Sequence, residues 1–135
     1  MEERLRALGV KLTPQRVELS KTIKEIGIRH PSFNEVYKAV KAKHPSISRS
    51  TVHYNLKSMI ELGLIGSFSY RGETRYETNP ALHINLAEPD GRIRDIKKEE
   101  VMKYLQEIIK LIDDEEGIHV RRLIILAEID AARSF

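Results

Sequence analysis

Apolar residues in the first half of the chain recur at helical spacing. The clearest stretch follows Ser48, where Val52, Leu56, Met59 and Ile60 stand at positions i, i+4, i+7 and i+8. A serine ahead of such a stretch is a common N-cap, because its side-chain oxygen accepts a hydrogen bond from an otherwise unpaired backbone amide. The pattern predicts a helix that begins after Ser48 and packs one apolar stripe against a core.

Three further helices are expected before this one, each marked by residues that start or stop a helix. Thr13 can cap the second of them, and Pro14 can occupy its first turn. Ser32 and Glu35 form the pattern of a capping box ahead of the third. The expected spans are residues 3–8, residues 14–26, and the segment from Ser32 to His44-Pro45.

Two β-type segments follow the last of these helices. Gly63 can adopt the left-handed conformation that ends a helix. Beyond it, Leu64–Tyr70 and Glu73–Thr78 flank a tight turn at Arg71-Gly72. A helix that leads into a hairpin in this way is typical of a winged helix, in which the helix contacts DNA and the hairpin is the wing.

The side of this helix opposite the apolar stripe is polar and basic. At about 100° per residue, Ser50, Tyr54 and Lys57 fall on that side. His53 lies at its border and Arg49 in the first turn. This character favours contact with DNA phosphates. It argues against a winged helix used as a protein-interaction module, which predicts an apolar or acidic face.

The second half of the chain predicts a smaller α/β unit after a hinge at Asn79-Pro80. Leu82–Ala87 and Arg92–Ile96 flank the turn signature Pro89-Asp90-Gly91, which predicts a second hairpin. An amphipathic helix is expected over Lys97–Ile112. The residues on its apolar side are Val101, Tyr104, Leu105, Ile108 and Ile112.

Two segments near the end of this half carry further expectations. The acidic run Asp113–Glu116 opposes the helix dipole, so the helix is expected to end and fray there. Ile118–Ile129 is apolar and β-branched without polar alternation, which predicts a strand covered on both faces. Two or three strands and one helix in about 55 residues bury little surface alone. Dimerisation through this half would supply the missing core.

The charge differs between the two halves. Residues 1–80 contain 14 Lys and Arg against eight Asp and Glu, whereas residues 81–135 contain nine against 12. A basic half beside an acidic half is typical of a nucleic-acid-binding module joined to a module without that function. Solvated surface charge alone is the plainer alternative.

Composition excludes several classes of chemistry. The chain contains no cysteine, which excludes disulfides, Cys-type zinc sites and thiol catalysis. No apolar run approaches the roughly 18 residues of a membrane span, and the segment Met1–Arg4 lacks the pattern of a signal peptide. We therefore expect a cytoplasmic protein.

An ordered set of short motifs runs through the first 65 residues. The motifs are Gly9-Val10-Lys11-Leu12-Thr13-Pro14-Gln15-Arg16, His30-Pro31-Ser32, Val36-Tyr37, Ser48 with Thr51-Val52, and Gly63-Leu64-Ile65. This set resembles the ferric uptake regulator (Fur) family, and its peroxide-responsive branch most, over about residues 7–96. The resemblance implies an α/β (α+β) protein with a winged helix-turn-helix DNA-binding domain at residues 1–79. A dimerisation and metal-sensing domain would occupy residues 80–135. The implied function is that of a homodimeric, metal-responsive transcriptional repressor, not an enzyme.

The resemblance also implies which residues contact DNA. The family's DNA-contacting tyrosine corresponds to His53, a departure that changes the group offered to a base edge. Tyr54 follows it and can contact thymine methyls or the backbone, and Lys11 matches a position that reaches toward the minor groove. Helix geometry adds Arg49 and Lys57, and the wing tip adds Arg71, as contacts to phosphates. The expected DNA-binding set is Lys11, Arg49, Ser50, His53, Tyr54, Lys57 and Arg71.

The family's metal-sensing site takes histidines and carboxylates from three segments, and the matching residues here are His30, Glu77, His83 and Asp95. A further family histidine corresponds to Ala81, and Leu86 and Pro89 stand where one zinc-binding cysteine pair would be. Two imidazoles and two carboxylates can hold Fe, Mn, Zn or Ni as divalent ions, with water completing the shell. One metal per subunit would then bridge the two halves and fix the angle between them. We expect His44 and His119 to be surface residues.

The four matching residues could instead have purely structural roles. His30 could be a loop residue, Glu77 a wing salt-bridge partner and Asp95 a turn or cap residue. The protein would then be a family member that has lost metal control, which Ala81 and the missing cysteines favour. A metal-dependent hydrolase would use similar ligands, but no nucleophile or phosphate-binding loop accompanies them. Peroxide sensing through oxidation of a ligand histidine is a further alternative.

Overall fold

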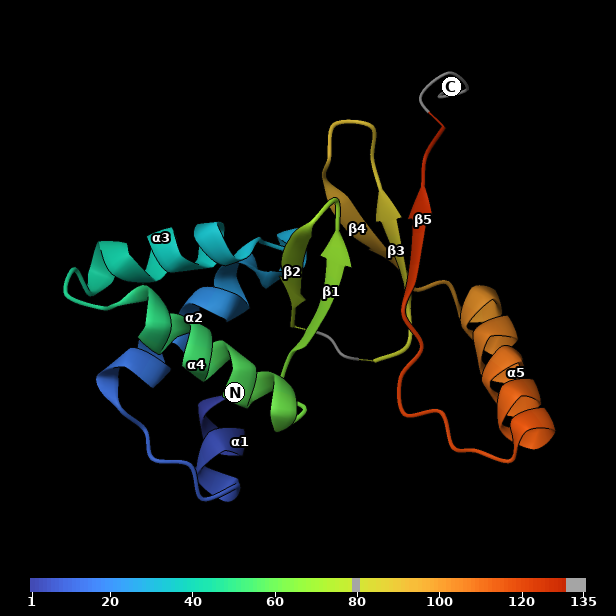
Figure 1. Cartoon of the computed structure of the whole chain (residues 1–135), viewed down its shortest axis with the longest axis horizontal. Coiled ribbons are helices and arrows are strands. Elements are labelled where there is room, and N and C mark those ends of the chain that lie inside the picture. Colours follow the sequence, from blue (N-terminus) through green and yellow to red (C-terminus); the bar gives the residue numbers. More distant parts are fainter. Residues whose placement is uncertain (79–80, 131–135) are drawn as a thin grey trace. The chain divides into compact units, whose positions relative to one another are not determined.

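The structure is a computed structural model that describes residues 1–78 and 81–130 (Figure 1). Its helices and strands form two compact units, Met1–Pro80 and Ala81–Phe135. The mixture of both element types confirms the α+β class expected from the sequence. The hinge predicted at Asn79-Pro80 lies outside the described residues.

The first unit combines helices with one hairpin. Its elements are α1 (Glu2–Ala7), α2 (Pro14–Ile26), the 3-10 helix η1 (Gly27–Arg29), α3 (Phe33–Lys43), α4 (Arg49–Glu61), β1 (Gly66–Tyr70) and β2 (Glu73–Glu77). Thr13, Ser32 and Ser48 each accept a hydrogen bond from the backbone amide three residues further on. Because these side chains pair amides that the helix leaves unpaired, α2, α3 and α4 begin where the sequence predicts.

The core of this unit lies between α2, α3 and α4. Val52, Leu56 and Met59 of α4 are buried, and Ile60 is partly buried against the same cluster. Their partners are Leu19 and Ile23 of α2, Val36 and Val40 of α3, and Leu64 and Ile65. Burial of each large apolar side chain stabilises the fold by about 1.5–3 kcal/mol. The predicted stripe is confirmed, and its burial fixes which side of α4 faces outward.

The hairpin after α4 is the predicted wing. β1 and β2 pair antiparallel in continuous register. Arg71 and Gly72 at the turn have φ values of 51° and 78°, as a two-residue type I′ turn requires. Ser32, just before α3, forms an antiparallel bridge with Arg75 of β2. The segment before α3 is therefore fastened to the wing strand.

The second unit is a small sheet with one long helix. Its elements are β3 (Ile84–Ala87), β4 (Ile93–Ile96), α5 (Glu99–Glu116) and β5 (Ile125–Glu128). β3 lies in the centre, antiparallel to β4 and parallel to β5. In the β3–β4 turn, the Arg92 amide donates to the Asp90 carboxylate at 3.0 Å. This hydrogen bond holds the pKa of Asp90 below its usual value. The second predicted hairpin is thus confirmed.

Helix α5 continues through the acidic run to Glu116, so the expectation that the helix ends at Ile112 was wrong. It ends instead at Gly117, whose φ of 64° is the left-handed conformation of a helix C-terminus. The Asp113 carboxylate accepts a hydrogen bond from the Val120 amide at 2.7 Å. Unfavourable charges at an exposed helix end cost only about 0.3–1 kcal/mol, too little to unwind a turn.

No helix in the described residues has the length and apolar character to cross a membrane.

The predicted strand over Ile118–Ile129 is shorter and less covered than expected. Only Ile125–Glu128 forms β5, and its apolar side chains are half-buried, not covered on both faces. β5 is an edge strand that pairs with the four residues of β3. Its length is limited because a strand extends only as far as its partner offers backbone groups.

Candidate metal ligands and the DNA-facing surface

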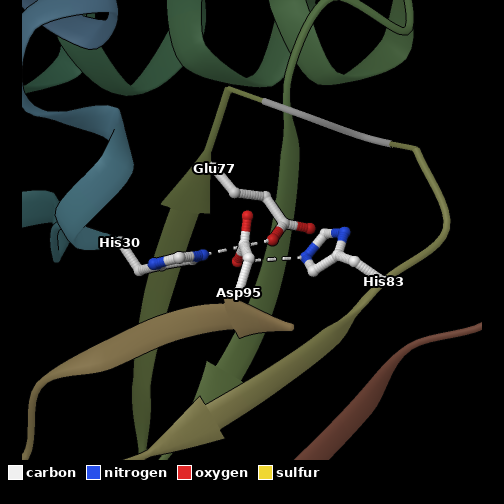
Figure 2. A group of neighbouring side chains, drawn as sticks. All are labelled: His30, Glu77, His83 and Asp95. Carbon is white, nitrogen blue, oxygen red and sulfur yellow. Dashed lines mark ion pairs between the residues drawn. The ribbon is translucent and has the colours of Figure 1, made fainter. Parts of the chain in front are cut away.

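Two of the predicted metal ligands lie side by side in the first unit. His30 follows η1 and Glu77 ends β2, and Nε2 of His30 is 3.7 Å from Oε2 of Glu77 (Figure 2). Both side chains are buried, and the His30 ring contacts the Phe68 ring at 5.9 Å between centroids. A buried imidazole beside a buried carboxylate offers the nitrogen and oxygen donors that divalent transition metals accept.

Strand β2 holds His30 in place. The backbone of His30 has φ 52° and ψ 62°, the left-handed region that residues other than glycine seldom adopt. The Arg75 guanidinium donates to the His30 carbonyl oxygen at 3.1 Å, and the Tyr76 amide donates to the Pro31 carbonyl oxygen at 2.9 Å. Burial raises the pKa of Tyr76, so its phenol is neutral at physiological pH. The two hydrogen bonds from β2 offset the backbone strain at His30, and the strained conformation places its ring toward Glu77.

Gly27 packs against Thr78, and we expect Gly27→Ala to disturb the loop that carries His30. The backbone at Gly27 has φ −59°, which alanine adopts freely. The added Cβ would overlap the Cγ2 methyl of Thr78. Such overpacking costs about 1–3 kcal/mol of unfolding free energy. Denaturant unfolding should show this loss for Gly27→Ala and its recovery in Gly27→Ala/Thr78→Ser, which lacks the methyl group. Equal stability of both variants would contradict a steric origin.

The other two predicted ligands face each other in the second unit. His83 stands just before β3 and Asp95 lies on β4, with Nε2 of His83 3.5 Å from Oδ1 of Asp95 (Figure 2). His83 is buried and Asp95 is half-buried. Nζ of Lys97 lies 3.7 Å from the second oxygen of Asp95. This hairpin therefore presents a second histidine–carboxylate pair.

Neighbouring oxygen atoms orient the ring of His83. Its Nδ1 lies within hydrogen-bonding distance of the Ala81 carbonyl oxygen, and its Nε2 is 3.1 Å from Oδ1 of Asn85. A neutral imidazole carries one N–H, so when Nδ1 donates to Ala81 the Nε2 lone pair faces the oxygens of Asn85 and Asp95. Lone pairs that converge in this way fit a bound cation.

The predicted ligands thus occur as two histidine–carboxylate pairs, one in each unit. Two imidazoles and two carboxylates are a donor set that could hold a metal ion. The chain has no cysteine, so a Cys-type zinc site is excluded. Of the remaining predicted surface histidines, His119 has a side chain 92% exposed, while His44 is half-buried where α3 ends.

The polar side of α4 is exposed, as predicted. Tyr54 is 64% exposed, and Lys57 one turn further on is also exposed. A shallow groove runs along this side, and its lining residues are Phe33, Arg49, Ser50, His53, Tyr54 and Lys57. All five α4 residues predicted to contact DNA therefore share one accessible surface.

Arg49 is held at the start of α4 by three residues of α3. Its guanidinium donates to Oδ1 of Asn34 at 2.7 Å and lies 5.0 Å and 4.8 Å from the ring centroids of Phe33 and Tyr37. A guanidinium that is already ordered loses less side-chain entropy when it binds a phosphate. The aromatic pair thus presents the Arg49 charge at the surface.

The remaining two predicted contacts lie on the α1–α2 loop and the wing. Lys11 is exposed, and its carbonyl oxygen accepts a hydrogen bond from Arg16 at 2.8 Å. Arg16 also donates to Oδ1 of Asn55 on α4 at 3.1 Å, which ties the loop to that helix. Arg71 stands at the wing turn with its guanidinium 5.1 Å from the Tyr70 ring centroid.

Three residues that position these groups were missed in the sequence: Arg16, Arg75 and Asn85. The sequence could have indicated Asn85, because it stands two residues after His83 and side chains at that spacing in an extended segment point to the same side. The contacts of Arg16 with Asn55 and of Arg75 with His30 join residues 39 and 45 positions apart. No local pattern marks such pairs.

Helix α4 with its exposed basic side, followed by the β1–β2 wing, defines a winged-helix DNA-binding protein. A sequence profile of the ferric uptake regulator family matches residues 7–122, and the chain belongs to that family. Members of the family are transcriptional regulators and not enzymes. This excludes the metal-dependent hydrolase.

Individual relatives agree with this membership. The chain is 42% identical over 100 residues to the ferric uptake regulation protein homolog of Archaeoglobus fulgidus, which covers 74% of this chain and 77% of that protein. It is 32% identical over 95 residues to the peroxide operon regulator of Bacillus subtilis, which covers 69% of this chain and 65% of that protein. The Campylobacter jejuni peroxide stress regulator superposes with a TM-score of 0.71 at 27% identity, over 99% of this chain and 94% of that one. The resemblance seen in the sequence is confirmed.

Proposed function

We propose that the protein is a homodimeric transcriptional repressor whose binding to operator DNA is controlled by one divalent metal per subunit. The observation that carries the proposal is the orientation of His83, whose Nε2 faces the Asp95 carboxylate while Nδ1 is held by the Ala81 carbonyl. His30 and Glu77 offer the same two donor types. Fe, Mn, Zn and Ni as divalent ions all accept such donors.

In this proposal residues 1–79 are the DNA-binding domain and residues 80–135 the dimerisation and metal-sensing domain. Each histidine–carboxylate pair alone offers two side-chain donors, fewer than the four or more that these metals take from protein and water. Ligands from both pairs would complete one shell. A bound divalent metal supplies the attraction that favours one arrangement of the two domains.

Seven residues would contact the operator: Lys11, Arg49, Ser50, His53, Tyr54, Lys57 and Arg71. The exposed side of α4 would enter the major groove, as recognition helices do. His53 and Tyr54 there can reach base edges, while Arg49 and Lys57 suit phosphates. Lys11 and Arg71 would extend the contact on either side of α4. Because its target is the operator, the protein would act in the cytoplasm.

The homodimer is proposed from apolar surface in the second unit. Tyr104 and Leu111 of α5 are 57% and 59% exposed, and Ile108 is 43% exposed. Within the described part of the chain, β5 is an edge strand that pairs only with β3, so a second chain can pair its outer side. A second copy that covers this helix and strand would complete the small core.

Chelation of the purified protein tests the metal switch. We expect metal to be present as isolated or to bind on titration, and its removal to weaken DNA binding by about 5–150-fold, the usual range of coupling between two sites. The metal content would be measured by elemental analysis. Binding would be measured by anisotropy on a duplex selected from a random-sequence pool with metal-loaded protein.

One alternative has a specific observation in its favour. Ala81 replaces a family histidine and offers His83 only its backbone carbonyl. The loss of this ligand fits a family member without metal control, which would act constitutively or respond to another signal. DNA binding of equal strength before and after chelation would favour that alternative and would leave the DNA-binding function standing.

A further inference from the structure

Asn85 is a buried amide in an otherwise apolar strand. It is 1% exposed, with Ile84, Leu86 and Ala87 completing β3. Burying an amide is costly unless both of its ends find partners. Its nitrogen donates to the Ile125 carbonyl oxygen at 3.3 Å, and its oxygen lies 3.1 Å from Nε2 of His83. The second of these contacts depends on which atoms carry protons.

The neighbours of Asn85 determine which end of the amide faces His83. A reversed amide would place two oxygen atoms together at Ile125, so the nitrogen belongs there. Nδ1 of His83 lies against the Ala81 carbonyl, and in the neutral tautomer that donates to this carbonyl the ring proton is on Nδ1. In that tautomer the Asn85 oxygen faces the Nε2 lone pair of His83, and a cation bound to both atoms makes this contact favourable.

The distances agree with a metal shell. Metal–ligand bonds of about 2.0–2.2 Å at tetrahedral or octahedral angles place neighbouring donor atoms roughly 3.0–3.5 Å apart. Nε2 of His83 is 3.1 Å from Oδ1 of Asn85 and 3.5 Å from Oδ1 of Asp95. Asn85 and Asp95 are also direct cross-strand partners, so their side chains share one face of the sheet.

We propose that Asn85 is itself a metal ligand and that its side-chain oxygen supplies the donor that Ala81 does not. The inference rests on the proposed metal site and makes its donor set two nitrogens and three oxygens. Oxygen donors suit Mn(II), whereas imidazole suits Zn(II) and Ni(II). Replacing an imidazole by an amide oxygen therefore shifts the preference of this site toward Mn(II).

Two substitutions separate a ligand role from a structural one. Asn85→Asp keeps an oxygen toward His83 but removes the N–H that donates to Ile125. Asn85→Leu has similar volume and removes both. If Asn85 is a ligand, Mn(II) affinity is retained in Asn85→Asp and falls at least about 10-fold in Asn85→Leu, the lower end of the range for lost metal-site partners. Both variants lack the N–H that donates to Ile125, so thermal stability measured without metal should fall in both.

The experiment uses the full chain, stripped of metal and titrated with Mn(II) alone, with free Mn(II) read from its electron paramagnetic resonance signal. Equal loss of affinity in both variants would overturn the ligand role, and so would a wild-type chain that binds no Mn(II). If Asn85→Asp keeps its Mn(II) affinity and Asn85→Leu loses it, but Mn(II) does not change DNA binding, the ligand assignment stands and the proposed switch fails. If metal controls DNA binding and Asn85→Leu binds Mn(II) normally, the switch stands and the ligand assignment fails.

Discussion

Replacing His83 by alanine is expected to abolish most of the metal dependence of DNA binding. The substitution removes an imidazole whose Nε2 lies 3.5 Å from the Asp95 carboxylate and 3.1 Å from the Asn85 amide oxygen. The remaining donors would bind metal more weakly. The 5–150-fold gain in DNA affinity expected from about 1–3 kcal/mol of coupling should shrink to about twofold or less. DNA affinity without metal should not change.

The measurement is fluorescence anisotropy on the selected duplex, with and without metal, for three variants. His119→Ala is the matched control, because that histidine is 92% exposed and lies outside both pairs. Lys57→Ala should weaken binding in both states and lower the salt dependence by about one phosphate contact. If His83→Ala and Lys57→Ala behave alike, the switch is wrong.

Leu111→Glu is expected to convert the protein from a dimer to a monomer. Leu111 lies on α5 and is 59% exposed in the single chain, so a glutamate there is tolerated by the subunit itself. In a dimer that covers α5, the same carboxylate would be buried without a partner, at a cost of several kcal/mol. A monomer occupies one half-site at a time. Its affinity for a two-half-site operator should therefore fall by about 10²–10⁴-fold.

Sedimentation velocity would measure the oligomeric state, and Leu8→Glu is the control. Leu8 is also an exposed leucine, at 52%, but it lies in the first unit. This variant should remain dimeric. An unchanged dimer in Leu111→Glu would refute α5 as the interface, and dissociation of both variants would refute the specificity of the effect.

Local sequence signals predicted the first unit closely. Thr13, Ser32 and Ser48 mark the starts of α2, α3 and α4, since each cap depends on an amide only three residues away. The wing turn at Arg71-Gly72 is equally local, because its two residues alone set its geometry. Interactions between residues so close in the chain can be predicted from the sequence without knowledge of the fold.

The two errors in the second unit have different causes, a local one at the end of α5 and a longer-range one at β5. Gly117, not the acidic run before it, decides where α5 ends, because exposed charge at a helix terminus has a small effect. The apolar segment from Ile118 predicted a long, covered strand. β5 starts only at Ile125, where β3 offers a partner. Strand length depends on pairing, which a single segment does not contain.

By itself the sequence determined the winged helix, the basic side of α4, and four candidate ligands through the family motifs that surround them. Only the tertiary structure decided that His30 lies beside Glu77, that His83 lies beside Asp95, and that the Asn85 oxygen joins the second pair. Arg75, which holds His30, is 45 residues away from it in the chain. The reason is physical: helix caps and amphipathic stripes arise from neighbours a few residues apart, whereas donor geometry arises where distant segments pack together.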